Sequence, residues 1–200
     1  MKNILSTKRL LLLLLVTVSM EVCSYAQQTL PANYTTSTPV NYIRTWDAKV
    51  PEQNANNLMS RPLRDVQQST QYFDGLGRPL QTVVKEGSLV TGSSPVDLVS
   101  PVIYDELGRE VYQYLPFASD SSNGLFKLNP FQQQVSFYNT LLAGQAGETG
   151  IGPNGENWAY SKTNYESSPL NRVDNTYAPG AAWVGSEGAG TEAARHNVRF

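Results

Sequence analysis

The feature that most constrains the fold of this chain is a short motif that occurs twice. Residues 73–78 read Phe-Asp-Gly-Leu-Gly-Arg and residues 104–109 read Tyr-Asp-Glu-Leu-Gly-Arg, with the two aspartates 31 positions apart. A third, degenerate copy begins at residues 165–166 (Tyr-Glu) and resumes at residues 170–172 (Leu-Asn-Arg) after a two-residue insertion. A unit that recurs along a chain predicts a repeated element of structure.

The chemistry of the motif predicts a β-hairpin. Strand-forming residues precede each Asp, and alternating side chains follow each Arg. The Asp side chain can accept a hydrogen bond from an amide two residues further on, Gly supplies a positive φ, and Arg can reach its own Asp or stack on a neighbouring aromatic ring. We therefore predict a mainly β fold of antiparallel hairpins, with a further strand within residues 40–50. The residues given structural roles in the turns are Asp74, Gly77, Arg78, Asp105, Gly108 and Arg109.

One segment has helical spacing instead. Asn129 followed by Pro130 is typical of a helix start. Apolar residues then recur at spacings of four, three and four, at Phe131, Val135, Tyr138 and Leu142. We predict an amphipathic helix over residues 131–143 that packs on the sheet, followed by a flexible loop over residues 144–157.

The first 26 residues have the layout of a secretory signal peptide. Basic residues come first, residues 10–20 are apolar with six consecutive leucines, and Ser24-Tyr25-Ala26 is typical of a cleavage site. A membrane-spanning helix needs about 20 apolar residues, and Glu21 ends this run earlier. A lipid anchor on Cys23 is disfavoured because Glu21 and Val22 precede it. The sequence predicts a secreted or cell-surface protein, cleaved after Ala26, with no membrane span after cleavage.

The expected organisation of the exported chain is simple. Residues 27–39 are polar and contain two prolines, which predicts an exposed leader. Residues 40–200 are expected to form one β-rich domain. Its last five residues look like the first half of a strand, so we expect this domain to be incomplete at its C-terminus.

Composition excludes several classes of function. The net charge of −2 argues against nucleic acid as a partner. One Cys and one His cannot build a Cys/His metal cluster or a disulfide scaffold. We expect no catalytic residue, no metal and no cofactor, because Asp74 and Asp105 are better explained as turn residues than as catalytic acids or metal ligands.

Two alternatives to a structural role remain open. Exposed Trp and Tyr side chains make strong contacts with sugars and proteins, and four candidates for such a surface are Trp46, Trp158, Tyr160 and Trp183. A secreted hydrolase would need two carboxylates about 5–10 Å apart, for which Glu148, Glu156 and Glu166 are the candidates.

The paired motifs resemble YD repeats, the building block of RHS and teneurin-type proteins. Asn41 to Arg44, the two motifs, and the Phe137-Tyr138 helix are similar to the N-terminal domain of secreted bacterial RHS-repeat proteins. This resemblance implies a non-catalytic scaffold or interaction module whose repeats contribute to a β-sheet shell around a C-terminal effector. It also implies partners among other repeats of the same or a longer chain, and protein or glycan at the cell surface.

Overall fold

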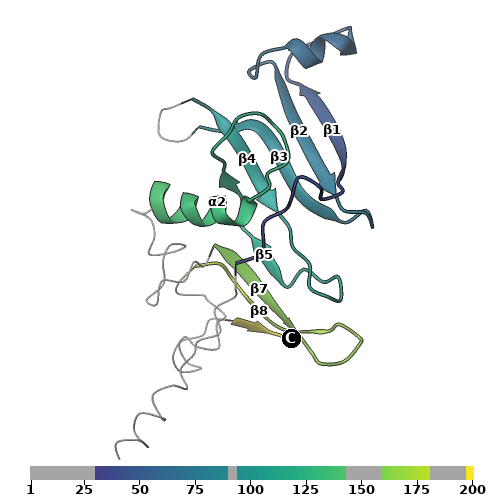
Figure 1. Cartoon of the computed structure of the whole chain (residues 1–200), viewed down its shortest axis with the longest axis vertical. Helices are drawn as coiled ribbons and strands as arrows, with labels where there is room; N and C mark the ends of the chain where they lie inside the picture. The colour runs from purple at the N-terminus through teal and green to yellow at the C-terminus, as the bar shows by residue number, and fades with distance from the viewer. Residues whose placement is uncertain (1–29, 90–93, 143–158, 181–196) are drawn as a thin grey trace, which may run out of the picture.

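The described residues form two antiparallel β-sheets, one helix beside them and a short 3-10 helix (Figure 1). The computed structural model describes residues 30–89, 94–142, 159–180 and 197–200. The predicted mainly β fold, with a single helix beside the strands, is confirmed. The predicted signal peptide and the loop over residues 144–157 lie outside the described residues.

The first sheet has the strand order β1-β2-β3-β4-β6. Its strands are β1 (Asn41–Ala48), β2 (Val66–Phe73), β3 (Pro79–Ser88), β4 (Val96–Pro101) and β6 (Phe117–Ala118). A short 3-10 helix, η1 (Ala55–Ser60), connects β1 to β2. Strand β1 is the predicted strand within residues 40–50, and it forms an edge of the sheet (Figure 1).

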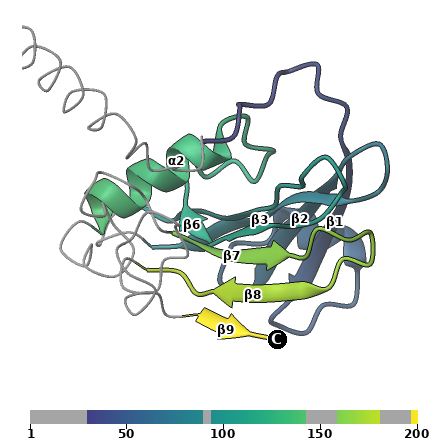
Figure 2. The same ribbon diagram turned by 90° about the horizontal axis from the view of Figure 1, so that it is seen from below.

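The second sheet has the order β5-β7-β8-β9. Its strands are β5 (Tyr112–Tyr114), β7 (Tyr160–Tyr165), β8 (Val173–Tyr177) and β9 (Asn197–Arg199). Figure 2 shows β7, β8 and β9 side by side, beyond the strands of the first sheet.

The second motif forms its turn, but the strand that follows it directly does not pair with the strand that precedes it. The first motif joins β2 to β3, and the third joins β7 to β8, each as an antiparallel pair. The second motif instead follows β4 in the first sheet and precedes β5 in the second. Strand β5 pairs with β7 instead, and the chain returns to β4 only at β6, which pairs with Leu98 and Val99. After the second turn the chain therefore enters the second sheet at β5 before it rejoins the first sheet at β6.

The predicted helix is present, with a different internal geometry. It consists of α2 (Pro130–Ser136) and a π-helical turn, η2 (Phe137–Leu141), and α2 contacts β4 and β6. Pro130 is in the first turn as predicted, but the Asn129 side chain makes no capping hydrogen bond to the backbone. The helix packs through Phe131 and Tyr138, which are buried.

The core lies where the helix meets the first sheet. Its buried apolar residues come from β2, β3, β4, β6, η2 and the residue before β7, namely Tyr72, Val83, Val99, Phe117, Tyr138 and Ala159. Burying such side chains contributes about 1.5–3 kcal/mol each for the larger ones. The core thus holds together segments that are distant in the sequence.

A buried ion pair fixes the segment that leads into the helix. The Lys127 Nζ atom lies 2.6 Å from Asp97 Oδ2 in β4, and both side chains are at most 4% exposed. Lys127 Nζ also donates to Ser121 Oγ at 2.8 Å and to Asn123 Oδ1 at 2.9 Å, so each of its three protons has an acceptor. Asp97 Oδ2 in addition accepts the Gly124 amide at 2.7 Å. The pair is satisfied on both sides, as burial of charge requires.

The described part of the predicted exposed leader, residues 30–39, is mostly exposed, but two of its residues contact the domain. Pro31 is buried and accepts a hydrogen bond from the Gln132 side chain at 3.3 Å. The Tyr34 ring packs 5.1 Å from the Phe126 ring, centroid to centroid, and the Tyr34 amide donates to the Leu128 carbonyl. Two apolar residues therefore anchor this polar segment to the domain, whereas most residues around them are exposed. Within the described ranges, no helix is long and apolar enough to span a membrane.

Candidate functional site

The first turn, residues 74–78, is organised by the Asp74 carboxylate. One of its oxygens, Oδ1, accepts the amides of Leu76 and Arg78, both at 2.9 Å. The other, Oδ2, accepts Arg78 Nε at 2.7 Å. Gly77 has φ +79° and donates its amide to the Asp74 carbonyl. One carboxylate thus closes the turn and fixes the direction of its own arginine.

The second turn, residues 105–109, repeats this geometry almost atom for atom. Asp105 Oδ1 accepts the amides of Leu107 and Arg109 at 2.9 and 2.8 Å, and Oδ2 accepts Arg109 Nε at 2.8 Å. Gly108 has φ +77°. The turn forms although the strands on either side enter different sheets, so its geometry is determined by the motif itself.

The third turn, residues 166–172, reaches the same result with different residues. Glu166 Oε1 accepts Arg172 Nε at 2.8 Å, as the Asp carboxylate does in the other turns. The Ser168 hydroxyl accepts the Leu170 amide at 3.2 Å and donates to Glu166 at 2.6 Å. Asn171 takes the place of Gly with φ +53°. The insertion therefore divides the two tasks of Asp between Glu166 and Ser168.

The arginine of each of the first two turns stacks on the aromatic ring of the next turn. The Arg78 guanidinium carbon lies 4.7 Å from the centroid of the Tyr104 ring, and that of Arg109 lies 4.7 Å from the centroid of the Tyr165 ring. Arg109 Nη1 also donates to Asn171 Oδ1 at 3.2 Å. A cation over an aromatic face contributes about 0.5–1 kcal/mol at an exposed site and more when it is desolvated. We call the three connected turns the turn ladder.

Strand register places each ring under its arginine. Gln81, three residues after Arg78, pairs with Pro101, three residues before Tyr104. Tyr112, three residues after Arg109, pairs with Lys162, three residues before Tyr165. The spacing is identical although the first pair of strands lies in one sheet and the second pair in the other. The ladder therefore follows one register rule. The third residue after each arginine pairs with a residue of the neighbouring strand, and the stacked ring lies three residues after that partner.

Gly108 has a second reason to be glycine. A Cβ atom at this position would lie 3.2 Å from Arg78 Nη1, whereas one at Gly77 would have no atom within 4 Å. The Arg78 side chain thus crosses the backbone of the second turn on its way to Tyr104.

The carboxylates of the ladder are held in their charged form. The amide and guanidinium of Arg78 lower the pKa of Asp74 below its usual value, and the Arg172 guanidinium does the same for the pKa of Glu166. Desolvation raises the pKa of Asp105, but its hydrogen bonds to Arg109 and Leu107 outweigh this and the net pKa is lowered. Each carboxylate is engaged with its arginine, so none has the raised pKa of a general acid.

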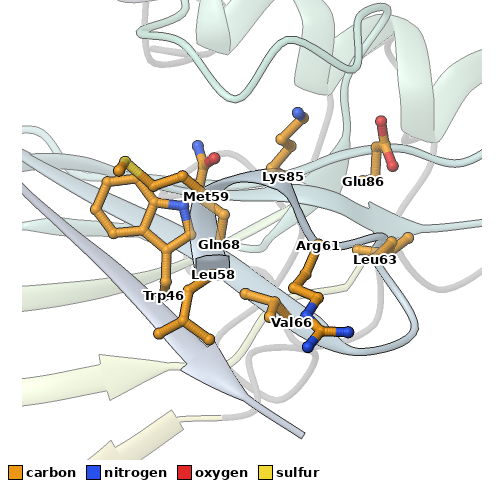
Figure 3. A pocket seen from close by; sticks show the side chains of 9 residues that line it. All are labelled: Trp46, Leu58, Met59, Arg61, Leu63, Val66, Gln68, Lys85 and Glu86. Carbon is orange, nitrogen blue, oxygen red and sulfur yellow. The ribbon is translucent and has the colours of Figure 1, made fainter. Parts of the chain in front are cut away.

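The two aromatic candidates that the structure describes lie in different sheets. Trp46 of β1 is half-buried beside a cavity of about 50 Å³ (Figure 3). The cavity is lined by Trp46, Leu58, Met59, Arg61, Leu63, Val66, Gln68, Lys85 and Glu86. It has room for a water molecule or two, so a sugar ring would have to stack outside it. Tyr160 packs against the Tyr112 and Tyr114 rings at 5.3 and 5.5 Å between centroids. Trp158 and Trp183 lie outside the described residues, and the carbohydrate-binding alternative stays a prediction.

One of the three candidate carboxylates of the hydrolase alternative is part of the third turn. Glu166 is committed to Arg172 and Ser168, and Glu148 and Glu156 lie outside the described residues. Among the residues that the structure describes, no group of three or more His, Cys, Asp or Glu side chains could hold a metal ion.

Sequence reasoning missed two features of the ladder. It allowed each arginine an aromatic neighbour but did not identify that neighbour as the ring of the next turn. It also gave Ser168 no role. A serine in a turn can accept a hydrogen bond from the amide two residues further on, as Ser168 does from Leu170.

The chain matches a known family of protein domains. A family model described as a domain of unknown function, DUF6443, matches residues 44–197. The matched range contains all three turns. No curated protein and no solved structure matches the chain.

Proposed function

This chain belongs to the DUF6443 family of domains of unknown function, and we propose that it is a non-catalytic, exported scaffold module of RHS/YD-repeat type. In this proposal it forms the leading part of a repeat protein, and its turns begin a β-sheet shell around a C-terminal effector. Its partners are further repeats of the same kind, and its signal peptide directs it to the cell exterior or surface.

The observation that carries this proposal is the linkage of successive turns. Turns that close independently would only need their Asp, Gly and Arg. Here Arg78 and Arg109 each also contact the ring of the following turn. Repeat proteins are extended by adding units that each contact the neighbouring units in the sequence.

The N-terminal end of the ladder also supports a leading position. Phe73 is the ring of the first turn, and Thr70, three residues before it, pairs with Arg44. The register rule then points to residue 41 as the place of a preceding arginine. That residue is Asn41. The ladder therefore starts at the first turn.

The gene and the exported protein together test the proposal. Reading the gene downstream of the codon for Phe200 should show the frame continuing into further aromatic-Asp-x-x-Gly-Arg motifs. N-terminal sequencing of the protein recovered outside the cytoplasm should begin at Gln27. A stop codon directly after Phe200, or a protein retained inside the cell with its first 26 residues intact, would overturn the corresponding half of the proposal.

A further inference from the structure

The described end of the ladder carries an arginine that no ring covers in the described structure. The Arg172 side chain is 70% exposed, compared with 38% for Arg78 and 23% for Arg109. All three arginines are held by a carboxylate of their own turn. The first two arginines stack on the ring of the next turn. Arg172 is oriented by Glu166 in the same way, but its guanidinium is exposed and has no such ring among the described residues.

The strands beside Arg172 repeat the geometry that delivers a ring to the other arginines. Asn175, three residues after Arg172, pairs with Arg199. At the equivalent places Gln81 pairs with Pro101, and Tyr112 pairs with Lys162.

The next hydrogen bond along the chain is also the same. The amide of the residue after the pairing donates to the carbonyl of the residue before it on the partner strand. This bond joins Val102 to Leu80 at 2.8 Å, Thr163 to Val111 at 2.9 Å, and Phe200 to Asp174 at 3.2 Å. Strand β9 thus approaches the third turn as β4 and β7 approach the first and second turns.

An open groove lies where the ring would enter. Its lining includes Tyr165, Glu166, Arg172, Val173 and Phe200. Phe200 itself is 81% exposed. The groove therefore offers a guanidinium face next to apolar surface, which suits an aromatic side chain.

We propose that Arg172 and strand β9 form a docking site for a fourth turn of the same type, whose aromatic ring stands three residues after Arg199, at the second position beyond Phe200. This inference rests on the proposed function and specifies which residue receives the next repeat and in which register. The ring stacks on the Arg172 guanidinium while its strand continues the pairing of β9 with β8.

The test extends the chain by one designed turn. After Phe200 we would add Ile and then a copy of residues 104–114, which places the copied tyrosine in the proposed register. The midpoint of thermal unfolding should rise by about 2–4 °C, from one cation–π contact and the added strand pairing. The backbone amides of β9 should also become more protected from hydrogen exchange.

Two register controls use the same added residues. Omitting the Ile, or adding two, moves the ring by one position, which turns it to the opposite face of the strand. Neither control should stabilise the chain. Equal stabilisation in all three registers, or none in any, would overturn the proposal.

A pair of arginine variants isolates the contact. In the correctly extended chain, Arg172→Gln should remove the part of the gain that comes from the cation–π contact, measured against the unextended chain with the same substitution. Arg64→Gln is the matched control, because Arg64 is 85% exposed and pairs only locally with Asp65. A gain that Arg172→Gln leaves undiminished would contradict the proposed contact. This outcome is separable from the gene and export results, since a frame that continues into repeats in another register would sustain the proposed function and refute this docking site.

Discussion

Gly77 and Gly108 occupy the same position in two turns, but only Gly108 also faces a neighbouring turn. Both have a positive φ, which an L-residue adopts at a cost of about 1–2 kcal/mol. Only at Gly108 would a Cβ press on Arg78. Glycine is therefore needed for its backbone conformation at the first turn, and for both its backbone conformation and its lack of a side chain at the second.

We expect Gly77→Ala to lower the free energy of unfolding by about 1–2 kcal/mol, the price of the backbone conformation alone. Gly108→Ala should lower it by about 0.5–1 kcal/mol more, because it also displaces Arg78 from Tyr104. Urea unfolding of both variants gives the difference. Gly75→Ala serves as the control, since a Cβ there meets no atom within 4 Å and φ is not positive. Equal losses at Gly77 and Gly108 would show that Arg78 simply moves aside.

At the scale of the element, the sequence predicts turns better than it predicts which strands pair. The second motif has the residues for a turn and makes one, yet its flanking strands separate. The reason is not local: β5 pairs with β7, a strand far along the chain, and the segment rejoins β4 only at β6, which includes the fully buried Phe117. No residue within the motif carries that information.

The helix shows the same limit for buried polar side chains. The spacing of Phe131 and Tyr138 predicts the packed face correctly. Gln134 lies on that face too, 1% exposed, where its amide donates to the carbonyls of Leu115 at 2.7 Å and Ala159 at 3.0 Å. From the sequence alone, a glutamine on an apolar helix face is not expected to be buried. The carbonyls that accept its hydrogen bonds come from segments that only the tertiary structure brings close.

The ion pair between β4 and the segment before the helix should be the most sensitive contact of this element. Lys127→Met keeps the aliphatic stem but leaves the Asp97 carboxylate buried without its cation, so we expect a loss of about 3–5 kcal/mol in the free energy of unfolding. Chemical denaturation measures it. Lys49→Met is the control, because the Lys49 side chain donates to Gln67 at the exposed surface, and its effect should stay within about 0.5 kcal/mol. A loss below about 1 kcal/mol for Lys127→Met would mean that water reaches Asp97.

At the scale of the whole molecule, the three turns form one electrostatic system that couples stability to pH. Asp74, Asp105 and Glu166 all have a lowered pKa in the folded chain. A carboxyl with a lowered folded pKa stabilises the native state above its unfolded pKa, and this contribution disappears as the pH falls through the folded value. Glu110 acts in the opposite sense, because burial raises its pKa.

We therefore expect the thermal midpoint to fall as the pH decreases below the ordinary values of 3.8 for Asp and 4.5 for Glu. The triple variant Asp74→Asn, Asp105→Asn, Glu166→Gln should start from a lower midpoint and lose less of it over the same range. Calorimetry between pH 6 and pH 2 compares the two chains. Parallel curves would assign the acid sensitivity to other carboxylates, such as Glu52, whose pKa the Arg61 contact lowers to about 2.

The direction of the ladder has a consequence for how the chain can be made. Every arginine is oriented by a carboxylate within its own turn, a few residues away, before it meets a ring that comes later in the sequence. A nascent chain can therefore complete each turn from its own residues as it is synthesised, and each finished turn then serves as a template for the one that follows. The closing of a turn needs no distant downstream partner, whereas the stacking of Arg109 waits for Tyr165 of the third turn. Such vectorial folding would let a long array of repeats assemble in the order in which it is translated.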